Sequence, residues 1–313
     1  MSGLAELLAA GRRPVVTAEM SAIDGGGLSD VKRHVEALAP YVDAINATDN
    51  PAAHAHASNV TIAIAIKQCG AEPIMQVVCR DKNRLAIQAD IVGAAMFGVE
   101  NLCALTGDDV TAGDEPEARR VFDLDGPQLI NVASGLAGGK YLSGRKLDPA
   151  PKLFIGAVEN PGAPPLEYRV KRAALKSAAG ARFLQLQICY HPDRLATFVA
   201  GAVAAGFTSR TALLPTICLT KSARALKFMD EKVPGISVPA SLIGRIAEAK
   251  DPAEAAYQLA LGQARAALAL PGVAGIHIAD FRHDGSLARL VTDLEIHTHL
   301  NEERNAHGSQ LAG

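Results

Sequence analysis

Acidic side chains close several apolar runs of this sequence, in positions where they could carry out acid–base chemistry. Glu19 lies near the end of the run at 14–20, and Asp108 follows the run at 101–106 after Gly107. Burial in an apolar strand predicts a raised pKa for Glu19, which would suit this residue to donate a proton near neutrality. A glycine before Asp108 would let a ligand approach the backbone closely. Glu19 and Asp108 are therefore the candidate catalytic residues.

Polar side chains also stand near the ends of other apolar runs. In a barrel of parallel strands the carboxyl ends meet at one mouth, and that face carries catalysis. A single acid in such a place can equally cap the next helix or belong to a structural network. Taken together, the polar side chains near the ends of these runs predict a polar site at the mouth. Besides Glu19 and Asp108, these side chains are Asn46, Asp49, Gln76, Arg80, Asp81, Glu159, Asn160, Gln185 and Gln187.

The apolar runs predict β-strands that are covered on both faces, because they are continuous rather than alternating. They span residues 14–20, 42–47, 73–79, 101–106, 153–159, 183–190, 211–216 and 273–279. Alanine-rich amphipathic segments predict helices at 29–39, 52–68, 83–97, 166–179, 192–205, 220–229, 239–248, 252–269 and 285–294.

Strands that alternate with helices in this way predict a fold of the α/β class, a (β/α)8 TIM barrel in a single domain. The barrel would occupy residues 1–299, followed by a polar, frayed tail at 300–313. A doubly wound open sheet is the alternative. Asp30 is expected to open the first predicted helix, and Asp251 with Pro252 to open the one at 252–269.

Two long loops interrupt the alternation, after the fourth strand at 108–126 and before the fifth at 135–151. Long ordered loops of a barrel usually belong to the active face, so both are expected there. Asp109 is expected to begin the first loop and to face water.

Composition argues against several kinds of partner. The formal net charge of -2 and the absence of Trp disfavour nucleic acid and an anionic membrane surface. The N-terminal apolar stretch precedes its Arg pair, the wrong order for a signal peptide, and the nearly uncharged run at 195–207 is too short to span a bilayer. The 5 cysteines show no CxxC pair, which suits a reducing compartment and predicts a cytoplasmic protein.

The sequence also lacks the usual motifs for phosphate or metal binding. GLAGGK at 135–140 is one residue too short for a phosphate loop and has Tyr141 where Ser or Thr should bind magnesium. No GxGxxG follows the first strand, which disfavours a dinucleotide-binding Rossmann site. His54 and His56 are two residues apart on a predicted helix and would point to different faces, so no metal site is expected.

Several segments resemble, in order, the 5,10-methylenetetrahydrofolate reductase family. ALTGDD at 104–109 resembles the L-[RT]-G-D motif, and the block from 75 to 109 resembles branches with Q-x-x-x-R-D-x-N before it. IGAVENPGAPP is similar to the G-A-x-x-N-P segment, and LKSAAGARFLQLQICYHPDR to K-x-x-A-G-A-x-F-x-x-T-Q. The segments at 225–239 and 273–285 resemble later parts of the family. The resemblance covers about residues 14 to 295, and the ordered set is more specific than any one motif.

This resemblance implies a TIM barrel that binds FAD and uses NADH or NADPH to reduce 5,10-methylenetetrahydrofolate to 5-methyltetrahydrofolate, a step of one-carbon metabolism and methionine biosynthesis. Glu19 would protonate N10 of the folate, and the N5 iminium formed by ring opening would accept hydride from the flavin. Asp108 would pair with the pterin and stabilise the cation. Gln187 would contact the folate and the nicotinamide in turn. The implied cofactor-binding positions are Asn46, Asp49, Gln76, Thr106, Gly107, Asp108, Asn160 and Lys176.

The chain departs from the family pattern at positions that hold the cofactor more than they serve the chemistry. Thr106 replaces the Arg of the commonest motif, AVENPG at 157–162 replaces Ala-Tyr-Pro-Glu, and Leu175 replaces an Arg. Ile188 and Cys189 stand where the family has aromatic rings. These departures leave FAD affinity and the electron donor open.

Three other functions remain alternatives. One is a related folate reductase with little or no FAD that uses another hydride donor or an electron-transfer protein partner. A second is a pterin-binding barrel that transfers a methyl group to a corrinoid protein. A third is a binding protein that has lost catalysis. The sequence does not fix the oligomeric state, and a homo-oligomer is one possibility.

Overall fold

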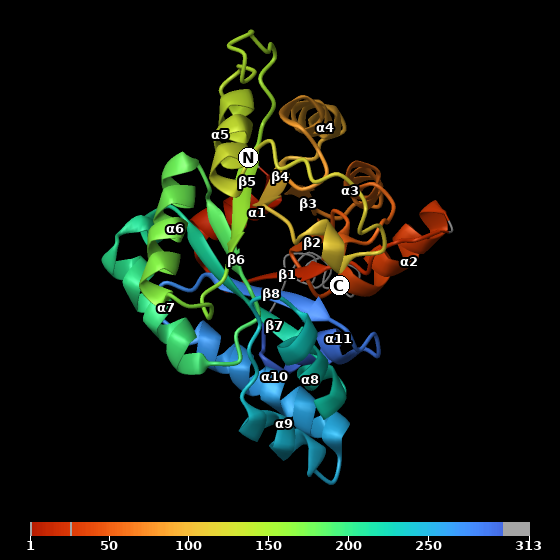
Figure 1. Cartoon of the computed structure of the whole chain (residues 1–313), viewed down its shortest axis with the longest axis vertical. Coiled ribbons are helices and arrows are strands. Elements are labelled where there is room, and N and C mark those ends of the chain that lie inside the picture. Colours follow the sequence, from red (N-terminus) through yellow and green to blue (C-terminus); the bar gives the residue numbers. More distant parts are fainter. Residues whose placement is uncertain (1, 26, 297–313) are drawn as a thin grey trace, which may run out of the picture.

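The computed structural model describes residues 2–25 and 27–296, and these form a closed barrel of parallel strands surrounded by helices (Figure 1). The predicted tail at 300–313 lies outside the described residues. The strands are β1 (Val15–Glu19), β2 (Ala44–Ala47), β3 (Pro73–Val78), β4 (Asn101–Leu105), β5 (Phe154–Glu159), β6 (Phe183–Leu186), β7 (Ala212–Leu219) and β8 (Gly275–Asp280).

Each strand pairs with the next in sequence, and β8 pairs with β1 to close the barrel, with Thr17 opposite His277. The predicted (β/α)8 barrel is thus confirmed, and the open sheet is excluded. The continuous apolar runs have the expected cause. One set of side chains packs against the helices, and the alternate set fills the barrel interior.

The helices of the described residues are α1 (Gly3–Ala10), α2 (Leu28–Leu38), α3 (Asn59–Gln68), α4 (Arg84–Met96), α5 (Gly126–Ala137), α6 (Leu166–Ala179), α7 (Pro192–Ala204), α8 (Ala223–Lys232), α9 (Ala240–Ala247), α10 (Pro252–Leu268) and α11 (Ser286–Asp293), with short 3-10 helices η1 (Pro51–Ala53), η2 (Val110–Ala112) and η3 (Phe207–Ser209). No helix of this part of the chain is long and apolar enough to cross a membrane.

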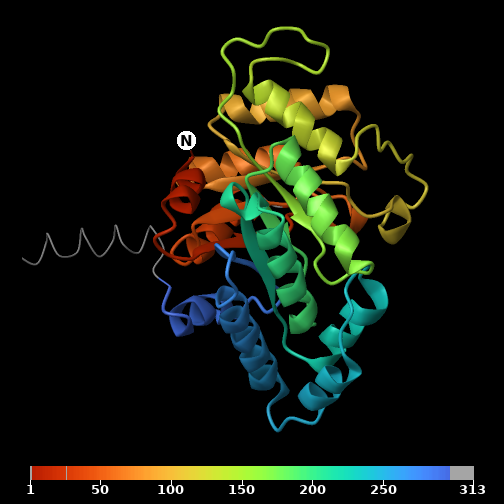
Figure 2. The same ribbon diagram turned by 90° about the vertical axis from the view of Figure 1, so that its left-hand side faces the viewer.

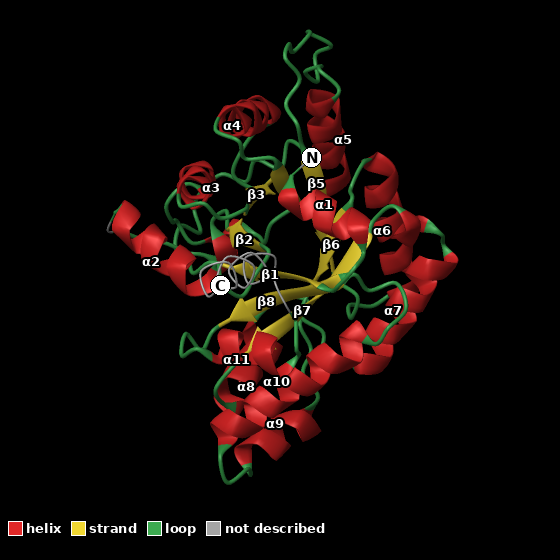
Figure 3. Ribbon diagram, turned by 180° about the vertical axis from the view of Figure 1, so that it is seen from behind, coloured by secondary structure: helices red, strands yellow, loops and turns green. Residues whose placement is uncertain are grey.

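Helix α1 closes the barrel at the amino-terminal ends of the strands (Figure 3). Its Leu4 is fully buried and packs with interior residues of the lowest layer, among them Val15, Phe183 and Leu214. The opposite end, where the strands finish, is therefore the open mouth. Helices α8 and α9 follow β7 and extend the molecule beyond the ring of barrel helices (Figure 1).

Several helix boundaries differ from those predicted. The predicted helix at 52–68 begins only at Asn59, so His54 and His56 lie in a loop instead of on a helix. Asp30 is not the residue before the first helical turn of α2; it lies inside that turn and accepts a hydrogen bond from the backbone N–H of Gly27. Asp251 and Pro252 open α10 as expected.

The long loops lie at opposite ends of the barrel. Residues 106–125 leave the carboxyl end of β4 and so start at the mouth, as predicted. Residues 138–153 connect the end of α5 to the start of β5 and project past α4 and α5 (Figure 2). The expectation that this second loop belongs to the active face is therefore wrong, because a helix-to-strand connection returns to the amino-terminal end.

Candidate functional site

Glu19 ends β1 at the mouth and lies between two polar side chains from other strands. The Gln76 amide of β3 donates to Glu19 Oε1 at 3.3 Å, and His277 Nε2 of β8 lies 3.8 Å from the same oxygen. The Glu19 side chain is 37% exposed, whereas His277 is buried. The carboxyl group is thus reachable from the mouth while its partners are held by the barrel.

The pKa of Glu19 is lower than that of an ordinary glutamate, contrary to the prediction. Burial does act to raise it, as expected, but the imidazole of His277 and the amide of Gln76 stabilise the carboxylate more strongly. The sequence could not show this, because both partners come from strands far away in the chain. Glu19 alone is therefore not poised as a proton donor at neutrality.

A layer of buried polar side chains lies below Glu19 in the barrel interior. Asn46 and Gln185 bond each other through both amide groups, at 2.8 and 3.0 Å. Thr17 Oγ1 lies 2.8 Å from His277 Nδ1, and Gln185 Nε2 lies 3.2 Å from the same nitrogen. Neither Thr17 nor His277 is among the residues predicted from the sequence. Their period-two alternation along β1 and β8 was the only available signal.

Asp49 is buried beside β3, outside this layer. Its carboxylate accepts from the backbone N–H of Val78 at 3.0 Å and lies 3.3 Å from the Lys82 ammonium, which also contacts Asn59 and Asp90. Burial raises the pKa of Asp49, and Lys82 offsets part of that effect. Asp49 therefore anchors the loop after β2 to β3.

Arg80 follows β3 and is almost fully buried. Its guanidinium makes two hydrogen bonds of 2.7 Å to Asp81 and a third, of 3.0 Å, to the backbone oxygen of Asn50. The same group lies 3.4 Å from the backbone oxygen of Asp108. Arg80 thus ties together the loops that follow β2, β3 and β4.

Thr106, Gly107 and Asp108 follow β4 at the rim. Thr106 and Asp108 are exposed, and the Asp108 carboxylate has no hydrogen-bond or ion-pair partner within residues 2–25 and 27–296. Gly107 has φ +90°, and a Cβ there would lie 2.4 Å from Val78 Cγ1. The space at this glycine is thus filled by the protein's own Val78 rather than left open for a ligand.

Asp109 faces water, as predicted, but is not free. Arg120 binds its carboxylate through two nitrogens, at 2.6 and 2.8 Å, and Thr111 donates to it from its backbone and its hydroxyl. Arg120 and Thr111 together hold the pKa of Asp109 well below its usual range. The two neighbouring acids therefore differ: Asp108 is open to a ligand, and Asp109 shapes the loop.

Asn160 and Lys176 lie away from the interior layer. The Asn160 side chain accepts from Gly162 and Ala163 and donates to the backbone oxygen of Gly235, so it builds the turn after β5. Lys176 belongs to α6 and is buried between this helix and β5, where its ammonium contacts Glu159 Oε2 at 2.7 Å and the backbone oxygen of Val158.

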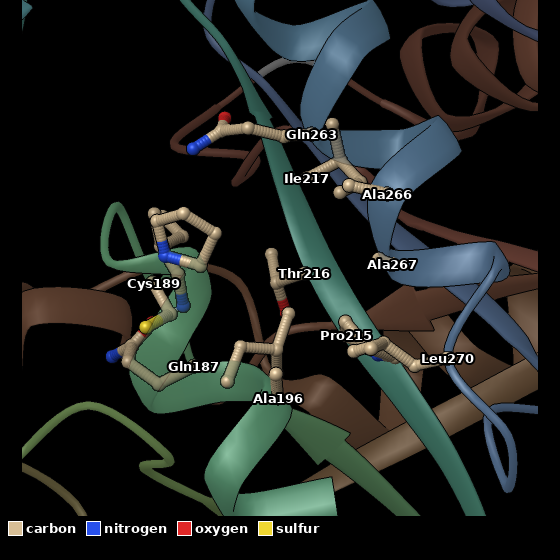
Figure 4. Close-up of a pocket in the computed structure, with 13 residues that line it drawn as sticks. Gln187, Cys189, Ala196, Pro215, Thr216, Ile217, Gln263, Ala266, Ala267 and Leu270 are labelled. Carbon is tan, nitrogen blue, oxygen red and sulfur yellow. The ribbon is translucent and has the colours of Figure 1, made fainter.

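Gln187 directly follows the last residue at which β6 pairs with β7. Pairing of β6 with β7 ends at Leu186 and Pro215, and β7 continues paired with β8 alone. Gln187 Oε1 accepts from the backbone of Ile188 at 2.9 Å. A cavity of about 260 Å³ lies beside the place where β6 and β7 cease to pair, with Gln187 and Cys189 on one side and Gln263 of α10 on the other (Figure 4).

The structure brings together some of the predicted residues and separates others. Glu19 and Gln76 are in contact, and His277 links Glu19 to the layer that holds Asn46 and Gln185. Asp49, Thr106, Gly107 and Asp108 belong to the loops around the same mouth. Asn160 and Lys176 are held by separate contacts beyond β5, and Gln187 lines the cavity by β7.

The residues expected to bind FAD do not fit that role as they stand. The Asn46 amide is satisfied by Gln185, the Asp49 carboxylate by Val78 and Lys82, and the Lys176 ammonium by Glu159. Each would have to give up a buried partner to bind a cofactor, which costs free energy. FAD binding stays a prediction, and only the rim residues Thr106 and Asp108 are exposed for it.

Solved structures of other proteins share the fold. An uncharacterized protein from Clostridium thermocellum that binds two copies of 5-methyl-5,6,7,8-tetrahydrofolic acid is 14% identical, with a TM-score of 0.67 over 94% of this chain and 99% of that one. EDTA monooxygenase from Chelativorans sp. BNC1 is 12% identical, with a TM-score of 0.55 over 91% and 94%. DmoA from Hyphomicrobium sulfonivorans is 11% identical, with a TM-score of 0.56 over 95% and 89%.

At these identities the likeness shows the fold alone. No curated protein is detectably similar to this chain in sequence. A sequence model of a protein family does match most of the chain. It covers residues 27–295 and describes methylenetetrahydrofolate reductase, so the chain belongs to the methylenetetrahydrofolate reductase family.

Proposed function

We propose that the protein reduces 5,10-methylenetetrahydrofolate to 5-methyltetrahydrofolate, with NADH or NADPH as the source of hydride. The observation that carries this proposal is the Glu19 carboxyl group at the mouth of a barrel of this family, held by Gln76 and His277. Support for a folate substrate comes from the Clostridium thermocellum protein of the same fold, which binds 5-methyltetrahydrofolate.

In this reaction Glu19 gives a proton to N10 of the folate. The C–N10 bond of the five-membered ring then breaks and leaves an iminium at N5, whose methylene carbon accepts the hydride. The half-exposed position of Glu19 leaves its carboxyl group accessible to a ligand in the mouth. The buried partners hold its orientation, which general acid catalysis requires.

Asp108 would bind the pterin. Its carboxylate is exposed and has no hydrogen-bond partner within the described residues, so both oxygens are available to the amino group and ring N–H of a pterin. Its negative charge would also favour the cationic iminium over the neutral substrate. Gln187 would contribute its side-chain N–H groups, because its Oε1 is already bound to Ile188.

The experiment is to mix the purified protein with NADH or NADPH and methylenetetrahydrofolate, with and without added FAD, and to follow nicotinamide oxidation. The absorbance of the fresh protein near the flavin bands shows whether FAD is retained. Turnover that yields 5-methyltetrahydrofolate supports the proposal. No turnover with either nucleotide, with or without FAD, contradicts it.

A second candidate is a folate reductase that takes electrons from another donor. The engaged state of Asn46, Asp49 and Lys176 favours it, because these side chains would otherwise hold the flavin. This candidate predicts tight folate binding with negligible oxidation of NADH or NADPH. A screen of reduced flavins and electron-transfer proteins as donors separates it from the first.

A further inference from the structure

The cavity of about 260 Å³ beside Gln187 lies on the wall of the barrel, between α7 and α10 (Figure 4). It forms where β6 ends at Leu186 and β7 runs on to Leu219 with only β8 beside it. The two helices do not close this space, because the side chains they present to it are short or apolar. From α7, α10 and the residues after α10 these are Leu195, Ala196, Ala266, Ala267 and Leu270.

The cavity is lined from both faces of β7. Successive side chains of a strand point to opposite faces. Ile217 belongs to the core between the barrel wall and the helices, whereas Leu214, two residues before Thr216, belongs to the core of the barrel interior. Both Thr216 and Ile217 line the cavity. The cavity therefore passes the unpaired edge of β7 and reaches the interior side of the wall.

Three uncharged polar side chains line the cavity and have hydrogen-bonding groups to spare. Gln187 Oε1 accepts from the backbone N–H of Ile188, which leaves the two N–H groups of its amide. The Thr216 hydroxyl and the Gln263 amide have no hydrogen-bond partner within residues 2–25 and 27–296. No charged side chain of the same residues lines the cavity.

The volume and the lining together define the chemistry of a ligand. An apolar cavity of about 150 Å³ in another protein accommodates benzene, so this larger one has room for an aromatic ring with a substituent. Its apolar walls would remove the ring from water, and its polar side chains would bond a neutral substituent. An ionic substituent would lose its hydration without meeting an opposite charge.

We propose that this cavity is a binding site for a small, neutral aromatic compound that carries a hydrogen-bond acceptor. The acceptor binds the N–H groups of Gln187, and the ring lies against the alanines and leucines of α7 and α10. Thr216 and Gln263 can each donate or accept, so they fix the orientation of the substituent. Neither Glu19 nor Asp108 lines the cavity, which makes this site separate from the proposed site of proton transfer.

Gln187 couples this site to the mouth, and this coupling rests on the proposed function. The N–H groups of Gln187 are those proposed to bind the folate. A ligand that accepts from them in the cavity draws the amide away from the mouth. Occupation of the cavity should therefore raise the KM for methylenetetrahydrofolate and leave kcat nearly unchanged.

The first test measures binding of two probes of the same shape, benzamide and benzoate, to the full chain by ligand-observed NMR titration. We expect benzamide to bind with a dissociation constant of about 1 mM or lower, and benzoate at least about tenfold more weakly because it is charged. Equal affinity for the two probes, or no binding of benzamide, would overturn the inference.

The second test places the benzamide site in this cavity. In Ala196→Phe the new ring occupies the space, so benzamide binding should be lost. Ala200→Phe is the matched control, because Ala200 is exposed on the same helix and does not line the cavity. Benzamide binding that persists in Ala196→Phe, or is lost equally in both variants, would contradict the assignment.

A further variant keeps the test decisive if Ala196→Phe does not fold. Gln263→Leu removes a side-chain amide that has no partner among the described residues, so the fold loses no hydrogen bond. Benzamide should bind about fivefold more weakly to it, the usual effect of one lost hydrogen bond. Unchanged affinity would contradict the inference.

Two results separate this site from the proposed function. Benzamide binding in a protein without reductase activity would contradict the function and leave the site intact, whereas reductase activity without benzamide binding would overturn the site alone. NADH serves as a competitor in the NMR titration. Displacement of benzamide by NADH would place the hydride donor in the cavity and overturn a separate site, and simultaneous binding of both supports it.

Discussion

Lys176 and Glu159 form a buried ion pair, with the ammonium nitrogen 2.7 Å from Oε2, on the outer wall of the barrel beneath α6. The pair is separate from the interior layer that contains Glu19's partners. Burial lowers the pKa of Lys176, and Glu159 offsets part of this effect. These contacts indicate that Lys176 fastens α6 to β5.

Replacing Lys176 with Met should therefore lower the free energy of unfolding by about 3 kcal/mol, because the Glu159 carboxylate loses its nearest buried cation. Urea unfolding followed by circular dichroism measures this. Lys171→Met is a matched control on the exposed face of the same helix and should change stability little. Unchanged stability together with weakened cofactor binding would instead assign Lys176 to the cofactor.

Replacing Glu19 with Gln should lower the turnover of methylenetetrahydrofolate by about 10²–10⁴, the usual contribution of a general acid. The amide keeps the size of the carboxyl group but cannot donate the proton to N10. Steady-state kinetics measures the fall, and calorimetry should show that the folate still binds. Loss of folate binding to the same extent would show that Glu19 positions the substrate instead.

Gly107→Ala should destabilise the protein by about 1–3 kcal/mol. A non-glycine residue is strained at φ +90°, and the new Cβ would lie 2.4 Å from Val78 Cγ1. The rim around Asp108 should shift with it, so folate binding should weaken as well. Thermal unfolding and folate titration measure the two effects.

The control for that change is Gly262→Ala, in the exposed middle of α10, where a Cβ would meet no atom within 4 Å. This substitution should stabilise the protein by about 0.5–1 kcal/mol, because alanine loses less backbone entropy than glycine in a helix. Equal destabilisation by both changes would contradict the special role of Gly107.

Glu254 should contribute to the stability of α10 and α11 in a pH-dependent way. Arg289 binds its carboxylate at 2.7 and 2.8 Å and, with Gln258, lowers the pKa of Glu254 from 4.5 to about 2. A lowered folded-state pKa means stability that is present above pH 4.5 and is lost as the pH falls toward 2. The difference in Tm between wild type and Glu254→Gln should shrink over that range. A difference that is constant with pH would exclude the charge as its origin.

Local sequence signals predicted much of the fold. The observed bounds of helix α6, 166–179, are those predicted from its amphipathic pattern; a proline precedes the helix and a glycine follows it. Helix α5 was missed, although Asp125 and Gln128 form a capping box, because its glycines and proline resemble the loops on either side. Strand β6 was predicted four residues too long, because its continuation is apolar although pairing stops opposite Pro215.

The sequence by itself determined the order of strands and helices, the closed barrel they imply, the family, and the placing of Glu19 and Asp108 at strand ends. Those features depend on residues close together in the chain, where periodicity and capping act. Only the tertiary structure decided which partners those side chains have. Glu19 contacts His277 and Gln76 at the mouth. Lys176 does not reach the mouth, because it pairs with Glu159 between α6 and β5. The closing of the barrel sets these contacts, because it brings together strands such as β1 and β8 that lie at opposite ends of the sequence.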